Sequence, residues 1–217
     1  YGKDKDNLTF LGFVNIKDEL RDEAKEGIKL IKSAGIKPIM ITGDAIDTAT
    51  SIAREVGLID INNNMVLDSN MLAQMNDDEI KRNLSKIAVI ARALPQDKSR
   101  MVNIIESMDL VVGMTGDGVN DAPALKKANV GFAMGSGTEV AKEAADIVIL
   151  DNNILSISKA ILYGRTIFKS IRKFIIYQLT VNMCALVLSI VGSFIGVTTP
   201  ITIVQMLWLN MIMDTFA

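Results

Sequence analysis

The sequence predicts an α/β fold, a Rossmann-like domain of parallel strands and helices, followed by an α-helical hairpin in a membrane. Short apolar runs alternate with amphipathic stretches through residues 1–152, and this alternation favours a parallel sheet covered on both faces. Charged residues are frequent up to Lys173 and almost vanish afterwards, where Asp214 is the only one. An uncharged apolar region of this kind favours membrane-spanning helices.

The composition excludes several classes of function. A formal net charge of −2 provides no basic field, so no nucleic-acid partner is expected. A single cysteine cannot form an internal disulfide, and the absence of histidine excludes imidazole metal sites and histidine general bases. The chain opens on Tyr1 without a signal peptide and stops within an apolar run at Ala217. We therefore interpret both ends as cut from a longer protein.

Six apolar runs are candidate strands, and four amphipathic stretches between them are candidate helices. The predicted strands are Leu8–Val14, Lys37–Ile41, Ile87–Ala91, Leu110–Met114, Val130–Met134 and Ile147–Leu150. The predicted helices are Glu19–Ala34, Ala45–Val56, Asp97–Met108 and Glu139–Ala145. The stretch Asp60–Lys86 is polar and rich in Asn and Asp, which predicts a surface loop with a small helix.

Two polar loops directly follow predicted strands. Thr42-Gly43-Asp44 follows the apolar run 38–41, and Thr115–Gly118 follows the run 111–114. In parallel sheets, ligands bind at loops that leave the carboxyl ends of the strands. These two loops are therefore the first candidates for a functional site.

Asp117 and Asp121 lie four residues apart around Gly118 and Asn120, within the ten-residue string Met114–Pro123. A glycine turn at a strand end lets backbone groups approach a phosphate closely. Carboxylate and carboxamide oxygens suit Mg²⁺, which also keeps waters and a substrate phosphate oxygen. The alternative is an Asx-rich turn that caps the following helix. A bare Gly-Asp-Gly would favour the cap, whereas the full string favours a functional site.

The Thr42 loop and Lys98 indicate a function only through their order along the sequence. At a helix start, the Thr42 hydroxyl and nearby amides would face an anion, although the loop alone is equally consistent with an N-cap. Lys98 begins a predicted helix, where a lone lysine is usually solvated. A threonine loop, a lysine and then an aspartate loop along one α/β domain match the later motifs of haloacid-dehalogenase-type phosphotransferases.

With their flanking residues, these motifs resemble the phosphorylation domain of P-type ATPases. The resemblance extends through Ala124–Ala128, Gly131–Gly135 and Ala144–Val148, and in effect it covers the whole chain. In that family an aspartate takes the γ-phosphate of ATP, and the formation and hydrolysis of the aspartyl phosphate drive ion transport. The resemblance implies that residues 1–152 are the C-terminal portion of a phosphorylation domain.

The resemblance also implies a role for each motif. Asp117 would bind Mg²⁺ with the support of Asn120 and Asp121. The phosphoryl and nucleotide-phosphate contacts would come from four further residues, with Lys98 neutralising the phosphoryl charge. These four are Thr42, Gly43, Asp44 and Lys98.

The family's nucleophile lies in the string Asp-Lys-Thr-Gly-Thr, which this sequence does not contain. Asp4-Lys5-Asp6 resembles that string only superficially, because it precedes a predicted strand and lacks the Thr-Gly-Thr. Leu8–Leu20 resembles the family segment that follows the nucleotide-binding domain. The sequence is therefore interpreted as a fragment without the phosphorylated aspartate and the ATP-binding domain, and we expect it to be inactive in isolation.

The C-terminal third predicts a stalk helix and two membrane spans. Residues 153–173 read as a cytoplasmic stalk helix that carries five basic residues. Residues 174–196 run for 23 residues without a charge, enough for a bilayer core of ~30 Å, and residues 201–217 form a second, truncated span. The basic residues place the α/β domain on the cytoplasmic side. A buried soluble helix is the alternative, but it would normally show a polar face.

Polar groups at membrane depth are candidates for ion binding. Asp214 is the clearest, and Asn210 lies four residues earlier on the same face of a regular helix. Asn182 and Gln178 have the same spacing on the first span. For these amides, hydrogen bonding between helices is the alternative.

The membrane segments look like those of plasma-membrane-type calcium pumps. Gln178–Asn182 is similar to their fifth membrane helix, and Val204–Ala217 is similar to their sixth. Asn210 and Asp214 match the calcium ligands of the sixth helix, and their oxygens suit Ca²⁺. Asn182 is a further candidate ligand.

The resemblance also implies one Ca²⁺ per cycle. Pumps that carry two ions place a glutamate three residues after the position of Asn182, where this sequence has Ala185. Met213 likewise replaces a threonine ligand of the sixth helix. The second ion site therefore lacks its oxygen ligands.

An ATP-driven calcium pump is thus the leading hypothesis, with ATP as substrate, Mg²⁺ as cofactor and the lipid bilayer as its setting. A P-type pump for Na⁺, K⁺ or H⁺ is the first alternative, and the pair Asn210 and Asp214 argues against it. A membrane-tethered phosphatase of the haloacid dehalogenase type is the second. That enzyme would need an Asp-x-Asp nucleophile after the first strand, and none is present.

Overall fold

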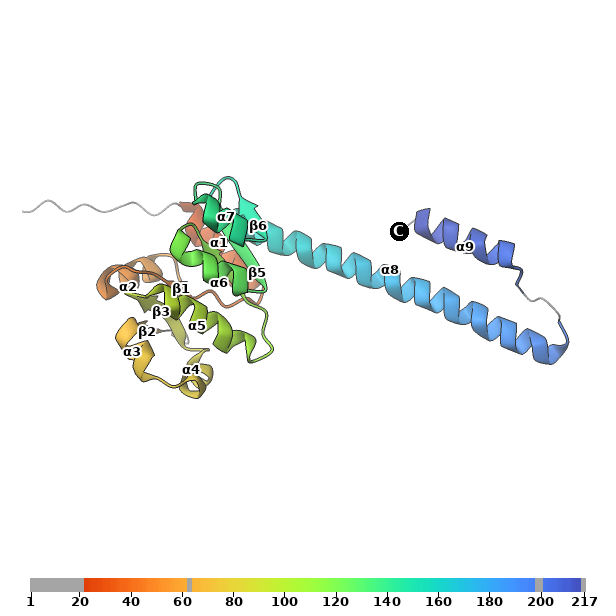
Figure 1. The fold of residues 1–217 in the computed structure, drawn as a ribbon, viewed down its shortest axis with the longest axis horizontal. Helices are drawn as coiled ribbons and strands as arrows, with labels where there is room; N and C mark the ends of the chain where they lie inside the picture. Colours follow the sequence, from red (N-terminus) through yellow and green to blue (C-terminus); the bar gives the residue numbers. More distant parts are fainter. Residues whose placement is uncertain (1–21, 62–63, 198–200, 216–217) are drawn as a thin grey trace, which may run out of the picture. The chain divides into compact units, whose positions relative to one another are not determined.

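The computed structural model describes residues 22–61, 64–197 and 201–215. The chain divides into two compact units, residues 1–157 and 158–217. The first unit is an α/β domain of parallel strands and helices, which confirms the predicted fold class (Figure 1). The predicted strand Leu8–Val14 lies outside the described residues.

The first sheet is built around β3 (Ile87–Ala91), with β1 (Met40–Ile41) on one side and β2 (Met65–Asp68) on the other (Figure 1). All three strands run parallel, and Val89 pairs with both Met40 and Val66. Every residue of β3 is buried. A continuous apolar run is what a strand covered on both faces requires, and the predicted range for β3 is confirmed.

Helices cover both faces of this sheet. On one face, Ala49 and Ala53 of α2 (Ile46–Glu55) pack with Val89. On the other, Met101 of α5 (Pro95–Glu106) packs with Ile90. The helix α1 (Asp22–Ser33) adds Ile28 to the cluster of the first face.

The segment between residues 60 and 86 holds more structure than the predicted loop and small helix. It contains β2 and two helices, α3 (Ser69–Gln74) and α4 (Asp77–Asn83), so that prediction was wrong. The polar residues act as helix caps: Asp68 accepts from the amide of Met71, and Asn76 and Glu79 form a reciprocal capping box. The polarity that indicated a loop therefore marks two helix starts.

The second sheet has the parallel order β4-β5-β6, where β4 is Gly113–Gly116, β5 is Val130–Met134 and β6 is Ile147–Ile149. The connecting helices are η1 (Val119–Asp121), α6 (Ala122–Lys127) and α7 (Glu139–Ala144). The sequence predicted one parallel sheet. Among the described residues the strands instead form two three-stranded parallel sheets, in which β1 and β4 are both edge strands.

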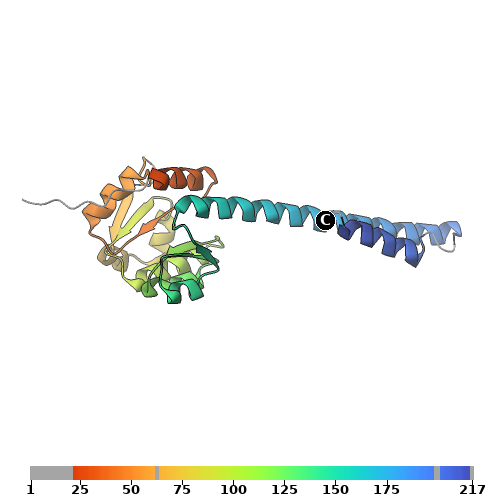
Figure 2. The ribbon, with the colours of Figure 1, turned by 90° about the horizontal axis from the view of Figure 1, so that it is seen from above.

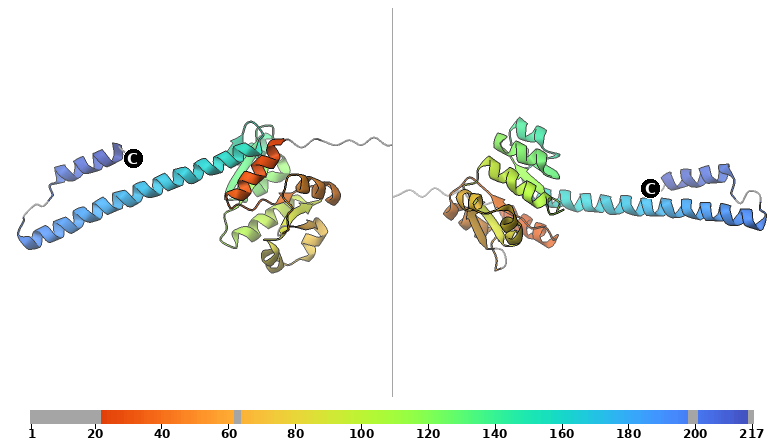
Figure 3. Two further views of the ribbon diagram at one scale, coloured as in Figure 1. Left: turned by 180° about the vertical axis from the view of Figure 1, so that it is seen from behind. Right: turned by 60° about the horizontal axis from the view of Figure 1, so that its bottom comes forward.

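The second unit consists of most of α8 (Ile154–Ile195) and of α9 (Ile203–Thr215). The helix α8 runs without a break through residues 173 and 174, where composition changes from basic to apolar (Figures 2 and 3). The division into a stalk and a membrane span at this point stays a prediction. At 1.5 Å per residue α8 is about 63 Å long.

By length and composition, α8 can cross a membrane. Its most apolar window is almost entirely unburied within the described residues, unlike the core helix of a soluble protein. The helix α9 is apolar but has only 13 residues, about 20 Å, which is short of the ~30 Å of a bilayer core.

We expect Ile90→Ala to lower the free energy of unfolding of the α/β domain by about 2–5 kcal/mol, because it leaves a cavity at a fully buried site. Ile61→Ala is the matched control, since Ile61 is 93% exposed and should change stability by less than about 0.5 kcal/mol. Urea unfolding of the detergent-solubilised chain measures both. Equal effects at the two positions would contradict the assigned core.

Candidate active site

The three sequence motifs meet around the start of α5. The Thr42 loop follows β1, and its backbone oxygen accepts from the amide of Ala93, two residues before the helix. Lys98 lies in the first turn of α5, and its Nζ is 2.5 Å from Oδ1 of Asp121. Asp121 closes the loop that follows β4. The structure therefore brings the predicted threonine, lysine and aspartate motifs to one end of the two sheets.

Backbone bonds to the end of β3 hold the Thr42 loop. The amide of Thr42 donates to the oxygen of Ile90, and the amide of Arg92 donates to the oxygen of Asp44, each at 2.9 Å. The Thr42 hydroxyl donates to Oδ2 of Asp44 at 2.8 Å and accepts from the Asp44 amide at 3.2 Å. At Gly43 an added Cβ would meet no described atom within 4 Å. The loop is thus fixed at its base and open at Gly43.

Asp97 organises the first turn of α5, a role that the sequence did not single out. Its buried carboxylate accepts from the Leu94 amide at 2.8 Å and from the Ser69 hydroxyl at 2.7 Å. Pro95 occupies the first helical position, which suits its fixed φ. The string Leu94–Asp97 could have indicated this role, because it places a proline at the helix start and an acidic residue two positions later. Asp97 fixes the turn from which Lys98 extends.

Asp121 lies inside the loop that follows β4, with 8% of its side chain exposed. Its Oδ1 pairs with Lys98, while its Oδ2 accepts from the amides of Asp117 and Gly118, each at 3.3 Å. An added Cβ at Gly116 would lie 2.8 Å from Cγ of Asp121, so only glycine allows this approach. Both carboxylate oxygens of Asp121 are therefore already engaged.

Asp117 and Asn120, in contrast, are exposed to solvent. The backbone oxygen of Asp117 accepts from the amide of Thr138 at 2.8 Å, which fixes its backbone. Within the described residues no group of three or more acidic or cysteine side chains could hold a metal by itself. Mg²⁺ needs only one or two carboxylates when phosphate and water complete its shell. The exposed Asp117 therefore fits an ion that is shared with a phosphate.

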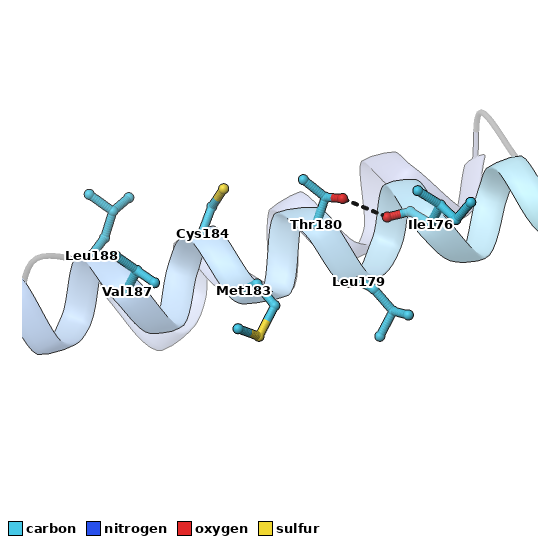
Figure 4. Close-up of a pocket in the computed structure, with 7 residues that line it drawn as sticks. All are labelled: Ile176, Leu179, Thr180, Met183, Cys184, Val187 and Leu188. Atoms are coloured by element: carbon cyan, nitrogen blue, oxygen red, sulfur yellow. Dashed lines mark hydrogen bonds between the residues drawn. The ribbon is translucent and has the colours of Figure 1, made fainter.

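The candidate ion ligands lie in the two apolar helices. Asn182 is exposed on α8, and Asn210 is half-buried on α9, four residues before Asp214. Oε1 of Gln178 is buried and has no hydrogen-bond partner among the described residues. Figure 4 shows an apolar groove along α8, where the Thr180 hydroxyl donates to the oxygen of Ile176 at 2.7 Å. The role of Asn182, Asn210 and Asp214 in ion binding stays a prediction.

Known protein families and proteins are similar to this chain over most of its length. The sequence model of the haloacid dehalogenase-like hydrolases matches residues 1–129, and a second model with the same description matches residues 112–161. Plasma membrane-type calcium-transporting ATPase 8 of Arabidopsis thaliana is 43% identical over 216 residues, which cover 97% of this chain and 20% of that protein.

Two more calcium-transporting ATPases show the same extent of similarity. Plasma membrane-type ATPase 7 of Oryza sativa subsp. japonica is 45% identical, over 98% of this chain and 21% of that protein. Calcium-transporting ATPase 2 of Schizosaccharomyces pombe is 43% identical, over 97% of this chain and 16% of that protein. The chain spans about a fifth of the length of the curated plasma membrane-type relatives that it matches.

Solved structures of P-type ATPases share the fold. One structure of a zinc-transporting PIB-type ATPase matches with a TM-score of 0.63 and 29% identity, over 92% of this chain and 26% of that one. A second structure of a zinc-transporting PIB-type ATPase, in a different state, matches with a TM-score of 0.62 and 31% identity, over 81% of this chain and 24% of that one. The chain therefore belongs to the haloacid dehalogenase-like hydrolase family and is, over nearly its whole length, a relative of plasma-membrane-type calcium-transporting ATPases.

Proposed function

We propose that the chain is part of a pump that uses ATP to move Ca²⁺ across a membrane through an aspartyl-phosphate intermediate. The observation that carries the proposal is the meeting of the Thr42 loop, Lys98 and the Asp117 loop around the start of α5. The similarity to calcium-transporting ATPases over nearly the whole chain supports the choice of reaction.

The nucleophile and the ATP-binding domain belong to other parts of the longer protein in this proposal. The chain spans about a fifth of its plasma membrane-type relatives, and it lacks the Asp-Lys-Thr-Gly-Thr string. In the described residues β1 and β4, which precede the Thr42 and Asp117 loops, are edge strands of separate sheets. The chain then supplies the groups that surround the phosphoryl group, and the aspartate that accepts it comes from elsewhere.

Each motif residue has a task in phosphoryl transfer. The Gly43 amide donates to a phosphoryl oxygen in the open space at Gly43. The Thr42 hydroxyl donates to Asp44 when no phosphoryl group is bound, and in this proposal it turns its single hydrogen from Asp44 to a phosphoryl oxygen when one is present. The Lys98 ammonium group offsets the negative charge of the transferred group. Lys98 reaches this position because Asp121 and the first turn of α5 hold it.

In the metal site Asp117 is the ligand and Asp121 shapes the loop. Asp117 has an exposed carboxylate, whereas both oxygens of Asp121 are bonded to protein groups. Asn120, exposed beside them, supplies an amide oxygen at the rim. Mg²⁺ held by Asp117 and a phosphate oxygen would neutralise charge during transfer.

The transport part of the proposal rests on α8 and α9. Asn210 and Asp214 lie one helical turn apart on α9 and supply amide and carboxylate oxygens for Ca²⁺, and Asn182 of α8 is a third candidate. The basic residues in the first half of α8 support a cytoplasmic position of the α/β domain in this proposal. A pump for Na⁺, K⁺ or H⁺ is the competing function.

Asp214→Asn is expected to abolish Ca²⁺-dependent phosphorylation of the full-length protein by labelled ATP, because it removes the charged ligand of the proposed ion site. Cys184→Ala on α8 is the control and should label like the unaltered protein. Labelling that ignores Ca²⁺ and responds to Na⁺ or K⁺ would favour the competing pump. Unchanged Ca²⁺ affinity in Asp214→Asn would remove Asp214 from the site.

One Ca²⁺ is expected to move for each ATP hydrolysed. By resemblance to pumps that carry two ions, Ala185 and Met213 take the places of oxygen ligands of a second ion, and neither side chain supplies an oxygen. Labelled Ca²⁺ uptake and phosphate release, measured together in sealed vesicles that contain the full-length protein, provide the ratio. A ratio of two would contradict the assignment of a single site.

Substitutions of Asp117 and Asp121 are expected to change different properties of the protein. Asp121→Ala should lower the free energy of unfolding of the α/β domain by about 3 kcal/mol, because Lys98 and two amides lose their partner. Asp117→Asn should leave stability unchanged and remove Mg²⁺-dependent phosphorylation. The control is Glu139→Ala, because the Glu139 side chain is 82% exposed and its pair with Lys142 should contribute less than about 0.5 kcal/mol. Urea unfolding separates the two roles, and equal stability of the two aspartate variants would contradict them.

A further inference from the structure

We infer that Asn152 is a positioning residue for Asp117 and acts through the loop Gly135–Thr138. Asn152 lies 35 positions after Asp117 in the sequence and two residues before the start of α8. The inference rests on the proposed function in one respect, because Asp117 is taken as the Mg²⁺ ligand. The connection between the two residues consists of two contacts, one on each side of the loop.

The first contact joins the loop to Asp117. The amide of Thr138 donates to the backbone oxygen of Asp117 at 2.8 Å. An added Cβ at Gly137 would lie 2.9 Å from that same oxygen and 3.0 Å from the Asp117 Cα. Only glycine allows so close an approach of two backbones. The position of the Asp117 backbone therefore depends directly on where the loop lies.

The second contact joins the loop to Asn152. The amide of Ser136 donates to Oδ1 of Asn152 at 2.9 Å. The neighbouring amide of Gly135 donates to the oxygen of Ile149 at 2.8 Å, and the Asn152 amide donates to that oxygen at 3.2 Å. The loop is thus held between Asp117 on one side and the segment 149–152 on the other. Asn152 holds the loop through its side chain.

The backbone of Asn152 explains why asparagine suits this position. Its φ of 51° lies in the left-handed region, which glycine, asparagine and aspartate adopt at little cost. Glycine would keep this backbone but lose the acceptor. Aspartate would keep both the backbone and an Oδ acceptor. The two substitutions therefore separate the role of the hydrogen bond from that of the turn.

A residue that orients a metal ligand affects the metal more than it affects stability. The Ser136 bond is exposed, so its loss should change the stability of the fold little. Loss of a group that orients a ligand typically lowers metal affinity by about 10- to 100-fold. Asn152 acts through one intervening loop, so we expect an effect at the lower end, about tenfold.

The test compares Asn152→Gly, Asn152→Asp and Asn129→Gly in the full-length protein. Asn129 is the matched control, because its Oδ1 accepts from the Val112 amide at 2.7 Å, at the end of β4 remote from Asp117. The first measurement is hydrogen exchange of the amides of residues 136–138 without Mg²⁺ or nucleotide. The second is the Mg²⁺ concentration that gives half-maximal phosphorylation by labelled ATP.

Asn152→Gly should speed exchange of these amides by about tenfold and raise the half-maximal Mg²⁺ concentration by about tenfold. Asn152→Asp and Asn129→Gly should match the unaltered protein in both measurements. Unchanged exchange and Mg²⁺ dependence in Asn152→Gly would overturn the inference, as would an equal shift in Asn129→Gly. Failure of Asn152→Asp to restore both values would also overturn it. An unaltered protein that forms no phosphoenzyme contradicts the proposed function instead, and hydrogen exchange then still decides the role of Asn152.

Discussion

The site depends on the ion pair between Lys98 and Asp121. This pair joins α5 to the loop after β4 across 23 positions of sequence, and the same carboxylate holds the amides of Asp117 and Gly118. A buried ion pair adds little net stability, because removing both charges from water offsets much of their attraction. Its main consequence here is geometric. It sets where the lysine and the exposed Asp117 stand relative to each other.

The start of α5 extends this constraint to the first sheet. Asp97 ties the helix start to Ser69 of α3, and Ala93, just before the helix, is bonded to Thr42. The segments that follow β1, β2 and β4 are thus all bonded to the start of α5 or to the residues just before it. A proline and a buried acid fix that turn without any ligand. Preorganised groups of this kind do not have to reorder when charge develops, which is the condition for electrostatic catalysis.

The pattern of apolar and polar residues predicted part of this structure and missed the rest. The range of β3 was predicted because all five residues are apolar, and the motif loops were placed because each follows such a run. Short β2 was missed because its polar neighbours resemble a loop, although Asp68 and Asn76 are helix caps. The pairing of Lys98 with Asp121 depends on how two sheets and a helix pack, which no local pattern records. For the same reason the sequence assigned Asp121 to the support of the Mg²⁺ site and did not predict its ion pair with Lys98.

The segment between β6 and α8 connects the loop after β4 to the start of the long helix α8. Ile149 and Asn152 hold the loop that touches Asp117. Two residues later, Ile154 begins α8 and packs against Gly27 of α1, where an added Cβ would lie 3.3 Å from the Ile154 carbonyl carbon. Only Asn153 separates Ile154 from Asn152, whose side chain holds the loop that contacts the Asp117 backbone. A displacement of Ile154 would therefore act on the same short segment that positions Asp117.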